Sequence, residues 1–230
     1  MRQKSYYIKN LKRVIDYHNK QLNDENTLDI YKSNHSVWLK IANDWMALLN
    51  SEKVSQKDAE DFFEQVCKCE KQSKMDSLFI PVCFWLKYCG YVNDKIKRLW
   101  RERFTALANY IDKYYEEYIE RGEATLDNII GVTAAKRWAK ILNFSSVTQA
   151  EVDTVMKLLL AHEDPPGLTL RSLCFDFRNW AELEGFKVIS KNKMIEHISY
   201  IIQLQMAKYY AESGKEYKFR KSVFVKHDFD

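Results

Sequence analysis

The residues best suited to chemistry in this sequence are cations near its C-terminal end. A predicted helix begins after Ser190, and its first turn carries two lysines and an asparagine. The free N–H groups and the dipole at such a helix start favour phosphate, and each Lys adds positive charge. Further cations follow beyond the helix. The predicted phosphate-contacting residues are Lys191, Asn192, Lys193, Lys215, Lys218, Arg220, Lys221 and Lys226.

The charge balance permits a polyanionic partner without requiring one. The whole chain has a net charge of +4, and residues 165–230 hold eleven Lys and Arg against eight Asp and Glu, a net of +3. Bases can stack on exposed aromatic rings. The rings close to these cations are Tyr209, Tyr210 and Tyr217, whereas most others fall on inward-facing stripes and are typical of core packing. The sequence therefore favours nucleic acid, DNA or RNA, as a partner.

The segment 180–186, followed by residues 190–194, resembles the winged-helix tails of viral and phage primase-helicases. This resemblance implies a winged-helix or helix-turn-helix part that binds DNA, in a viral or mobile-element protein. The tail from Tyr217 to Val225 alternates loosely between apolar and basic residues and is the one predicted strand. A solvated edge strand guarded by lysines would show the same pattern.

Cysteine and histidine spacing does not predict a metal site. Cys67 and Cys69 lie two apart in a helical pattern and so face different ways, while Cys83 lies in an apolar run. The segment 162–164 (His-Glu-Asp) has ligand chemistry, but adjacent residues seldom converge on one ion. We expect small packed cysteines, no metal and no cofactor.

No catalytic motif is present in the sequence. It lacks a Gly-rich phosphate loop, a Gly-x-Ser-x-Gly elbow and a His-Glu-x-x-His pair. Carboxylates such as Glu60, Glu64 and Asp176 lie on charged helix faces, and His18 and His197 sit beside apolar positions, as packed histidines do. We therefore expect a protein that is not an enzyme, with a site assembled from distant residues as the remaining alternative.

Scarce turn-forming residues predict long helices with short links. The chain has six Gly and three Pro in 230 residues, against typical usage of about 7% and 5%. The longest uninterrupted pattern, residues 93–121, repeats apolar side chains every three or four positions, with Asn93 as a cap and Gly122 beyond its end. It predicts a central helix that other helices cover, within an all-α helical bundle.

Shorter helical patterns flank this central helix. One of them, residues 5–22, places Lys9, Lys12, Arg13 and Lys20 opposite its apolar side chains. Residues 23–35 look like a loop, and Gly131 marks a turn. The two short helices of residues 133–160 have helix-turn-helix form. The acidic start of the second helix favours an ordinary helical hairpin over a DNA reader.

The prolines of the segment 162–167 suggest a link between a helical body, residues 1–164, and a C-terminal part, residues 165–230. The longest apolar run, Leu78 to Leu86, is far below the roughly 20 residues that span a bilayer, so no membrane partner is expected. Five cysteines and a polar N-terminus favour a cytoplasmic setting.

These patterns predict a non-catalytic nucleic-acid-binding or accessory protein that contacts phosphates through its basic C-terminal part. The alternative is a helical scaffold or assembly subunit of a viral or defence complex. Such a subunit would use its aromatic side chains to contact a protein partner or another copy of itself.

Overall fold

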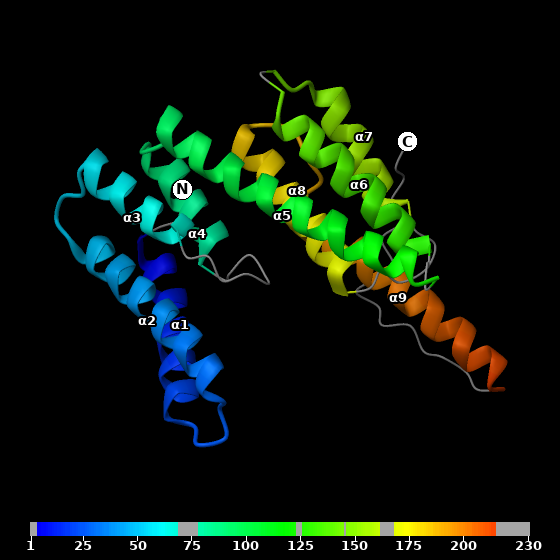
Figure 1. Cartoon of the computed structure of the whole chain (residues 1–230), viewed down its shortest axis with the longest axis horizontal. Coiled ribbons are helices and arrows are strands. Elements are labelled where there is room, and N and C mark those ends of the chain that lie inside the picture. Colours follow the sequence, from blue (N-terminus) through cyan, green and yellow to red (C-terminus); the bar gives the residue numbers. More distant parts are fainter. Residues whose placement is uncertain (1–3, 69–77, 123–125, 145, 162–167, 215–230) are drawn as a thin grey trace. The chain divides into compact units, whose positions relative to one another are not determined.

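The structure is a computed structural model that describes residues 4–68, 78–122, 126–144, 146–161 and 168–214 (Figure 1). All regular elements within these ranges are α-helices, which confirms the predicted all-α class. The helices are α1 (Lys4–Asn23), α2 (Asp29–Asn50), α3 (Gln56–Lys68), α4 (Phe79–Cys89), α5 (Asp94–Glu120), α6 (Leu126–Leu142), α7 (Gln149–Leu160), α8 (Leu168–Glu184) and α9 (Lys191–Glu212).

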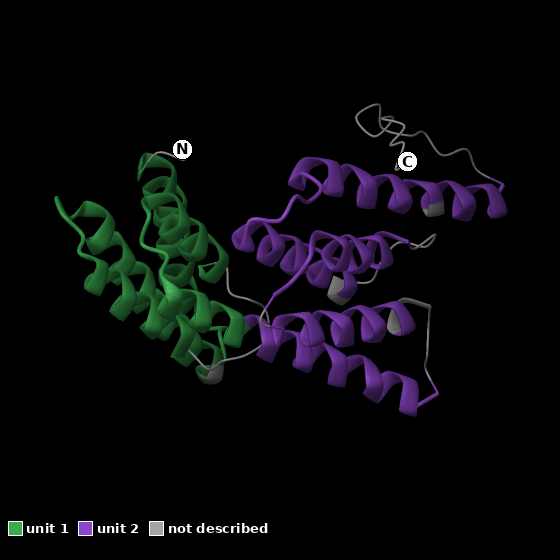
Figure 2. Cartoon of the chain, turned by 90° about the horizontal axis from the view of Figure 1, so that it is seen from above, with its two compact units in different colours: residues 1–103 green, residues 104–230 purple. Residues whose placement is uncertain are grey.

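The chain forms two compact units, residues 1–103 (unit 1) and residues 104–230 (unit 2), shown in different colours in Figure 2. In unit 1, α1 packs along α2, α2 contacts α3 and α3 contacts α4. In unit 2, α6, α7 and α8 pack against one another. The predicted link at residues 162–167 lies outside the described residues, so a boundary there stays a prediction.

Aromatic side chains dominate the core of unit 1. Trp45 contacts Phe62 and Trp85, with ring centroids 6.4 and 6.1 Å away, and Phe63 stacks on Phe79 at 5.9 Å. The two phenylalanines of α3 belong to the apolar positions that the sequence places at helical spacing. Burying such large rings provides much of the hydrophobic stabilisation of a small unit.

Trp138 of α6 lies at the centre of the core of unit 2 and is fully buried. Its ring contacts Phe104 at 5.7 Å, Phe177 at 5.6 Å and Trp180 at 6.1 Å. Phe104 belongs to the predicted central helix, now α5, whose buried stripe continues along the helix at the expected spacing. One residue of α6 thus joins the aromatic side chains of α5 and α8.

Several helix starts are set by local side-chain chemistry, as the sequence indicates. The Ser55 Oγ–H donates to the Asp58 carboxylate at 2.6 Å and accepts from the Asp58 N–H at 3.1 Å before α3. The Asn93 Oδ1 accepts from the Ile96 N–H at 3.0 Å before α5. Thr148 and Glu151 form the predicted capping box at α7, and α6 and α7 pack against each other as a helical hairpin.

The winged-helix prediction is not borne out. The described part of the chain contains no strand, and the predicted strand at residues 217–225 lies outside it. A winged helix requires paired strands soon after its recognition helix, whereas α9 continues for 22 residues after Ser190. This end of unit 2 is helical as far as it is described.

Two local predictions about loops are wrong. Residues 29–35, expected in a loop, form the first turns of α2, which pack along α1. Gly131, expected at a turn, lies inside α6 where the Tyr115 ring covers its backbone so closely that a Cβ would overlap the ring. Within the ranges that the structure describes, no helix combines the length and apolarity needed to cross a bilayer.

Candidate phosphate-binding site at the start of α9

The first turn of α9 presents the predicted lysines to solvent. Lys191, Asn192 and Lys193 are all exposed. Ser190 caps the helix with an extended backbone (φ −62°, ψ 149°), and its Oγ accepts from the Lys193 N–H at 3.2 Å. The N–H groups of Lys191 and Asn192 have no hydrogen-bond partner among the described residues. They remain available for an anion, together with the helix dipole.

The loop that leads into α9 is held by a side chain from another helix. Gln149 lies at the start of α7. Its side-chain Oε1 accepts from the Lys187 N–H at 3.0 Å, and its Nε2 donates to the Lys187 carbonyl at 2.8 Å. This pairing fixes the Lys187 backbone and leaves its side chain exposed. A third lysine is therefore presented from a loop whose position is defined before any ligand arrives.

Arg178 of α8 holds the other end of this loop. Its Nε–H donates to the Ile189 carbonyl at 2.9 Å, and its guanidinium forms an ion pair with Glu182 at 2.7 Å. Phe186 packs on Trp180 with ring centroids 6.0 Å apart. The loop is thus tied to α8 by a buried arginine and by an aromatic contact, which accounts for the ordered cap at Ser190.

Around this turn, residues 178–196 hold four basic side chains and three acidic ones, and one of the basic side chains, Arg178, is paired with Glu182. Lys187, Lys191 and Lys193 form no ion pair with any described residue. In the first turn of α7, the Glu151 carboxylate accepts the backbone and side-chain hydrogen bonds of Thr148, and these bonds lower its pKa. That acidic group is therefore committed to capping α7. The first turn of α9 and the loop before it thus offer an anion two N–H groups with no described partner and three exposed lysines.

The structure does not bring all of the predicted site together. Tyr209 and Tyr210 lie near the far end of α9, about 27 Å along the helix from Lys191. Tyr209 is exposed, and its ring meets the ring of Tyr210 edge-on at 6.0 Å. The remaining predicted contacts lie outside the described residues: Lys215, Tyr217, Lys218, Arg220, Lys221 and Lys226.

Metal and thiol chemistry find little support in the described ranges. No group of three His, Cys, Asp or Glu side chains there could hold a metal ion. Burial raises the pKa of the Cys67 thiol to about 12 and holds that of Cys83 well above its usual range. With no metal bound, both thiols are therefore protonated at neutral pH, and neither is a ready nucleophile.

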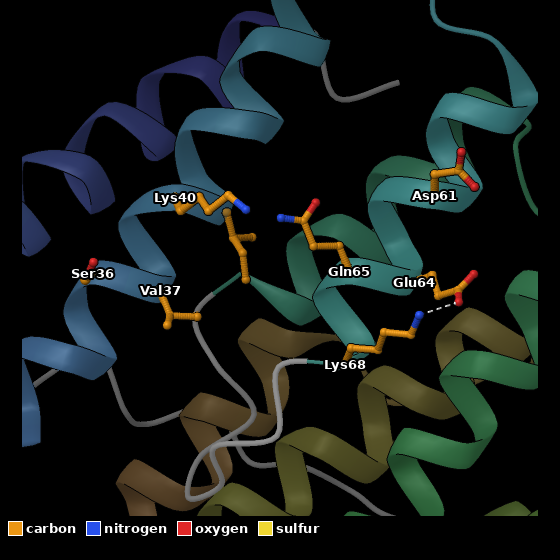
Figure 3. Close-up of a pocket in the computed structure, with 8 residues that line it drawn as sticks. Ser36, Val37, Lys40, Asp61, Glu64, Gln65 and Lys68 are labelled. Atoms are coloured by element: carbon orange, nitrogen blue, oxygen red, sulfur yellow. Dashed lines mark ion pairs between the residues drawn. The ribbon is translucent and has the colours of Figure 1, made fainter.

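A groove between α2 and α3 in unit 1, with a volume of about 700 Å³, is a further candidate site (Figure 3). Its charged groups are Lys40, Asp61, Glu64 and Lys68, and the last two form an ion pair at 2.7 Å. Hydrogen bonds from Lys68 and Lys95 lower the pKa of Glu64. The groove is therefore lined by equal numbers of basic and acidic side chains. The lowered pKa of the Glu64 carboxyl group does not suit it to proton transfer.

The titratable group with the largest upward shift among the carboxylates lies elsewhere. Burial raises the pKa of Asp176 in α8 to about 7, and no described residue forms an ion pair or hydrogen bond with it. Asp176 does not line the groove of unit 1.

Comparisons of the chain with protein family models, with curated proteins and with solved structures find no match.

Proposed function

We propose that the protein is a non-catalytic nucleic-acid-binding or accessory protein that contacts phosphates through the C-terminal part of unit 2. The observation that supports this proposal most directly is the ordered start of α9. Two N–H groups without described partners lie there beside the exposed Lys191 and Lys193, and the exposed Lys187 lies in the loop just before this turn. The five cations beyond residue 214 would extend the contact along the backbone of the nucleic acid.

Salt-dependent binding tests this proposal. Each phosphate neutralised on duplex DNA contributes about 0.9 to the slope of log K against log salt. Lys191→Ala with Lys193→Ala should therefore lower the slope by about 2, and Lys218→Ala with Arg220→Ala and Lys221→Ala by about 3. The matched control is Lys157→Ala with Lys208→Ala, which removes two exposed lysines of unit 2 that form no ion pair with a described residue. Equal slopes for all variants would contradict the proposal.

A second function, the helical scaffold, is favoured by the shaft of α9. Ile195, Tyr200, Met206 and Tyr209 are 43%, 38%, 40% and 65% exposed. A helix with apolar side chains on most of its circumference is normally covered on several sides. Light scattering should then report an oligomer whose dissociation is promoted by Met206→Glu. A strict monomer over a wide concentration range would count against self-assembly through α9.

A further inference from the structure

The outward face of α1, in unit 1, combines cations and aromatic rings at helical spacing. Tyr6, Lys9, Arg13, Tyr17 and Lys20 follow one another at steps of three or four residues, and all are exposed. Such steps keep side chains on one face of a helix. The face between Lys9 and Lys20 extends about 16 Å along the axis.

The charge of this helix is large relative to that of the chain. α1 holds five basic side chains and one acidic side chain, Asp16, so its excess of four equals the net charge of the whole protein. Lys9, Lys12, Arg13 and Lys20 form no ion pair with any described residue. Within α1, Asp16 is the one acidic side chain against these cations, and a polyanion bound here would displace the solvent ions around them.

Tyr17 is held in place between the cations of this face. It is 54% exposed, and its ring meets those of His18 and His35 nearly at right angles, with centroids 5.2 and 5.7 Å away. Those two histidines are joined by a hydrogen bond of 2.8 Å between their Nδ1 atoms. A ring fixed in this way loses little entropy when a planar group stacks on its open side.

The packing of α1 argues against a membrane as the partner. Its apolar side, including Tyr7 and Leu11, is buried where α1 packs along α2 (Figure 1). An interfacial helix needs that side free to enter the acyl region. An acidic peptide would satisfy the cations but would leave the Tyr17 ring without a planar partner. Alternating cations and rings instead match the phosphates and bases of a flexible strand.

We propose that the α1 face formed by Lys9, Arg13, Tyr17 and Lys20 binds single-stranded nucleic acid. The three cations contact phosphates, and Tyr17 stacks on a base. This surface lies in unit 1 and does not depend on the site proposed at the start of α9. The two surfaces can therefore succeed or fail separately.

The test measures binding of the full chain to a labelled short oligothymidylate as a function of salt. Lys9→Ala with Arg13→Ala and Lys20→Ala should weaken binding about tenfold and lower the salt slope by about 2, at 0.7 per single-strand phosphate. The matched control, Lys53→Ala with Lys97→Ala and Lys113→Ala, removes three exposed lysines that form no ion pair with a described residue. It should leave affinity and slope close to those of the wild type.

Stacking is tested by a separate pair of variants. Tyr17→Leu should weaken binding at least about fivefold, because one stacked base is lost, whereas Tyr17→Phe should retain the affinity. Circular dichroism and the unfolding midpoint of each variant show whether α1 remains folded. A variant that has lost its fold is replaced by Lys9→Gln with Arg13→Gln and Lys20→Gln, for which the same slope change is expected.

Three results would overturn the proposal. The first is an equal loss of affinity in the α1 variant and in the matched control, which means nonspecific attraction. The second is binding to phosphatidylserine vesicles or to polyglutamate as tight as binding to the oligothymidylate. The third is unchanged binding in Tyr17→Leu. If the α1 triple variant binds with wild-type affinity and salt slope while Lys191→Ala with Lys193→Ala weakens binding, the α1 surface alone is refuted.

Discussion

Units 1 and 2 each present a long helix to solvent, and the two helices distribute their side chains differently. α1 separates an apolar side, packed on α2, from an exposed cationic side. α9 carries two of its three lysines at its first turn, with Lys208 near its far end, and exposes apolar side chains along its length. The difference teaches that positive charge alone does not define a binding surface. α1 suits an extended polyanion, whereas α9 suits a phosphate at one end and an apolar partner along its length.

The units also differ in a titratable group whose pKa is shifted by desolvation, the buried His18 in unit 1 and the half-buried Asp176 in unit 2. In unit 1, burial and the neighbouring His35 lower the pKa of His18. In unit 2, burial raises the pKa of Asp176 to about 7. Both shifts favour the neutral form, but they make the stability of the two units depend on pH in opposite directions.

The largest expected effect distinguishes the two aromatic cores. Trp138→Ala removes the ring that joins α5, α6 and α8, and should cost about 3–5 kcal/mol of the free energy of unfolding. Hydrogen exchange should then show lost protection in α6 to α8, with α2 and α3 retained. Trp45→Ala is the matched change in unit 1 and should show the reverse pattern. Equal losses everywhere in both variants would mean that the units unfold as one.

The pH dependence of Asp176 gives the next largest effect. Its pKa is raised from 3.8 to about 7, so the folded protein binds more protons than the unfolded chain between these values. The free energy of unfolding should therefore fall as pH rises through this window, by up to about 4 kcal/mol. Asp176→Asn should abolish this loss in chemical denaturation at several pH values. An unchanged pH profile in that variant would contradict the assignment.

Gly131 tests how closely α5 and α6 pack within unit 2. A methyl group at position 131 would overlap the Tyr115 ring, so Gly131→Ala should destabilise unit 2 by about 1–3 kcal/mol despite the better helix propensity of Ala. The double variant Gly131→Ala with Tyr115→Leu should recover part of this loss. If Gly131→Ala were stabilising, the close contact between ring and backbone would be disproved.

The smallest expected effect concerns His18 and has the opposite sign to that of Asp176. Its pKa is lowered from 6.5, so below that pH the unfolded chain takes up protons before the folded one does. Stability of unit 1 should therefore decline as pH falls from 6.5 toward the lowered pKa. NMR titration of His18 and His35 measures this directly, and His35→Gln should move the pKa of His18 upward. A His18 pKa above 6.5 would contradict it.

The sequence predicts the helix ends well because they depend on nearby residues. Asn93, Thr148 and Ser190 each cap a helix within three positions along the chain. The sequence fails at residues 29–35 and at Gly131, where contacts from distant residues decide the outcome. His35 meets His18 across a separation of 17 residues, and Tyr115 covers Gly131 from another helix. Local polarity and helix breakers do not reveal such contacts.

The candidate sites divide in the same way. The exposed lysines at the start of α9 and the cationic side of α1 follow from spacing alone. The contacts of Gln149 and Arg178 that order the loop before α9 could not be predicted from spacing, because they join residues 38 and 11 positions apart. Likewise, no sequence pattern places the Tyr17 ring beside His35. Chemical groups were predictable, and their mutual placement required the fold.

The pairing between Gln149 and Lys187 restricts which residue can occupy position 149, although this is a surface position. The backbone of Lys187 offers one donor and one acceptor, and the side-chain amide of Gln149 forms a hydrogen bond with each. A carboxylate there would face the Lys187 carbonyl oxygen with no proton to give, and asparagine is one methylene shorter. Even slow hydrolysis of this single amide would therefore loosen the approach to α9 while leaving the hydrophobic interior unaltered.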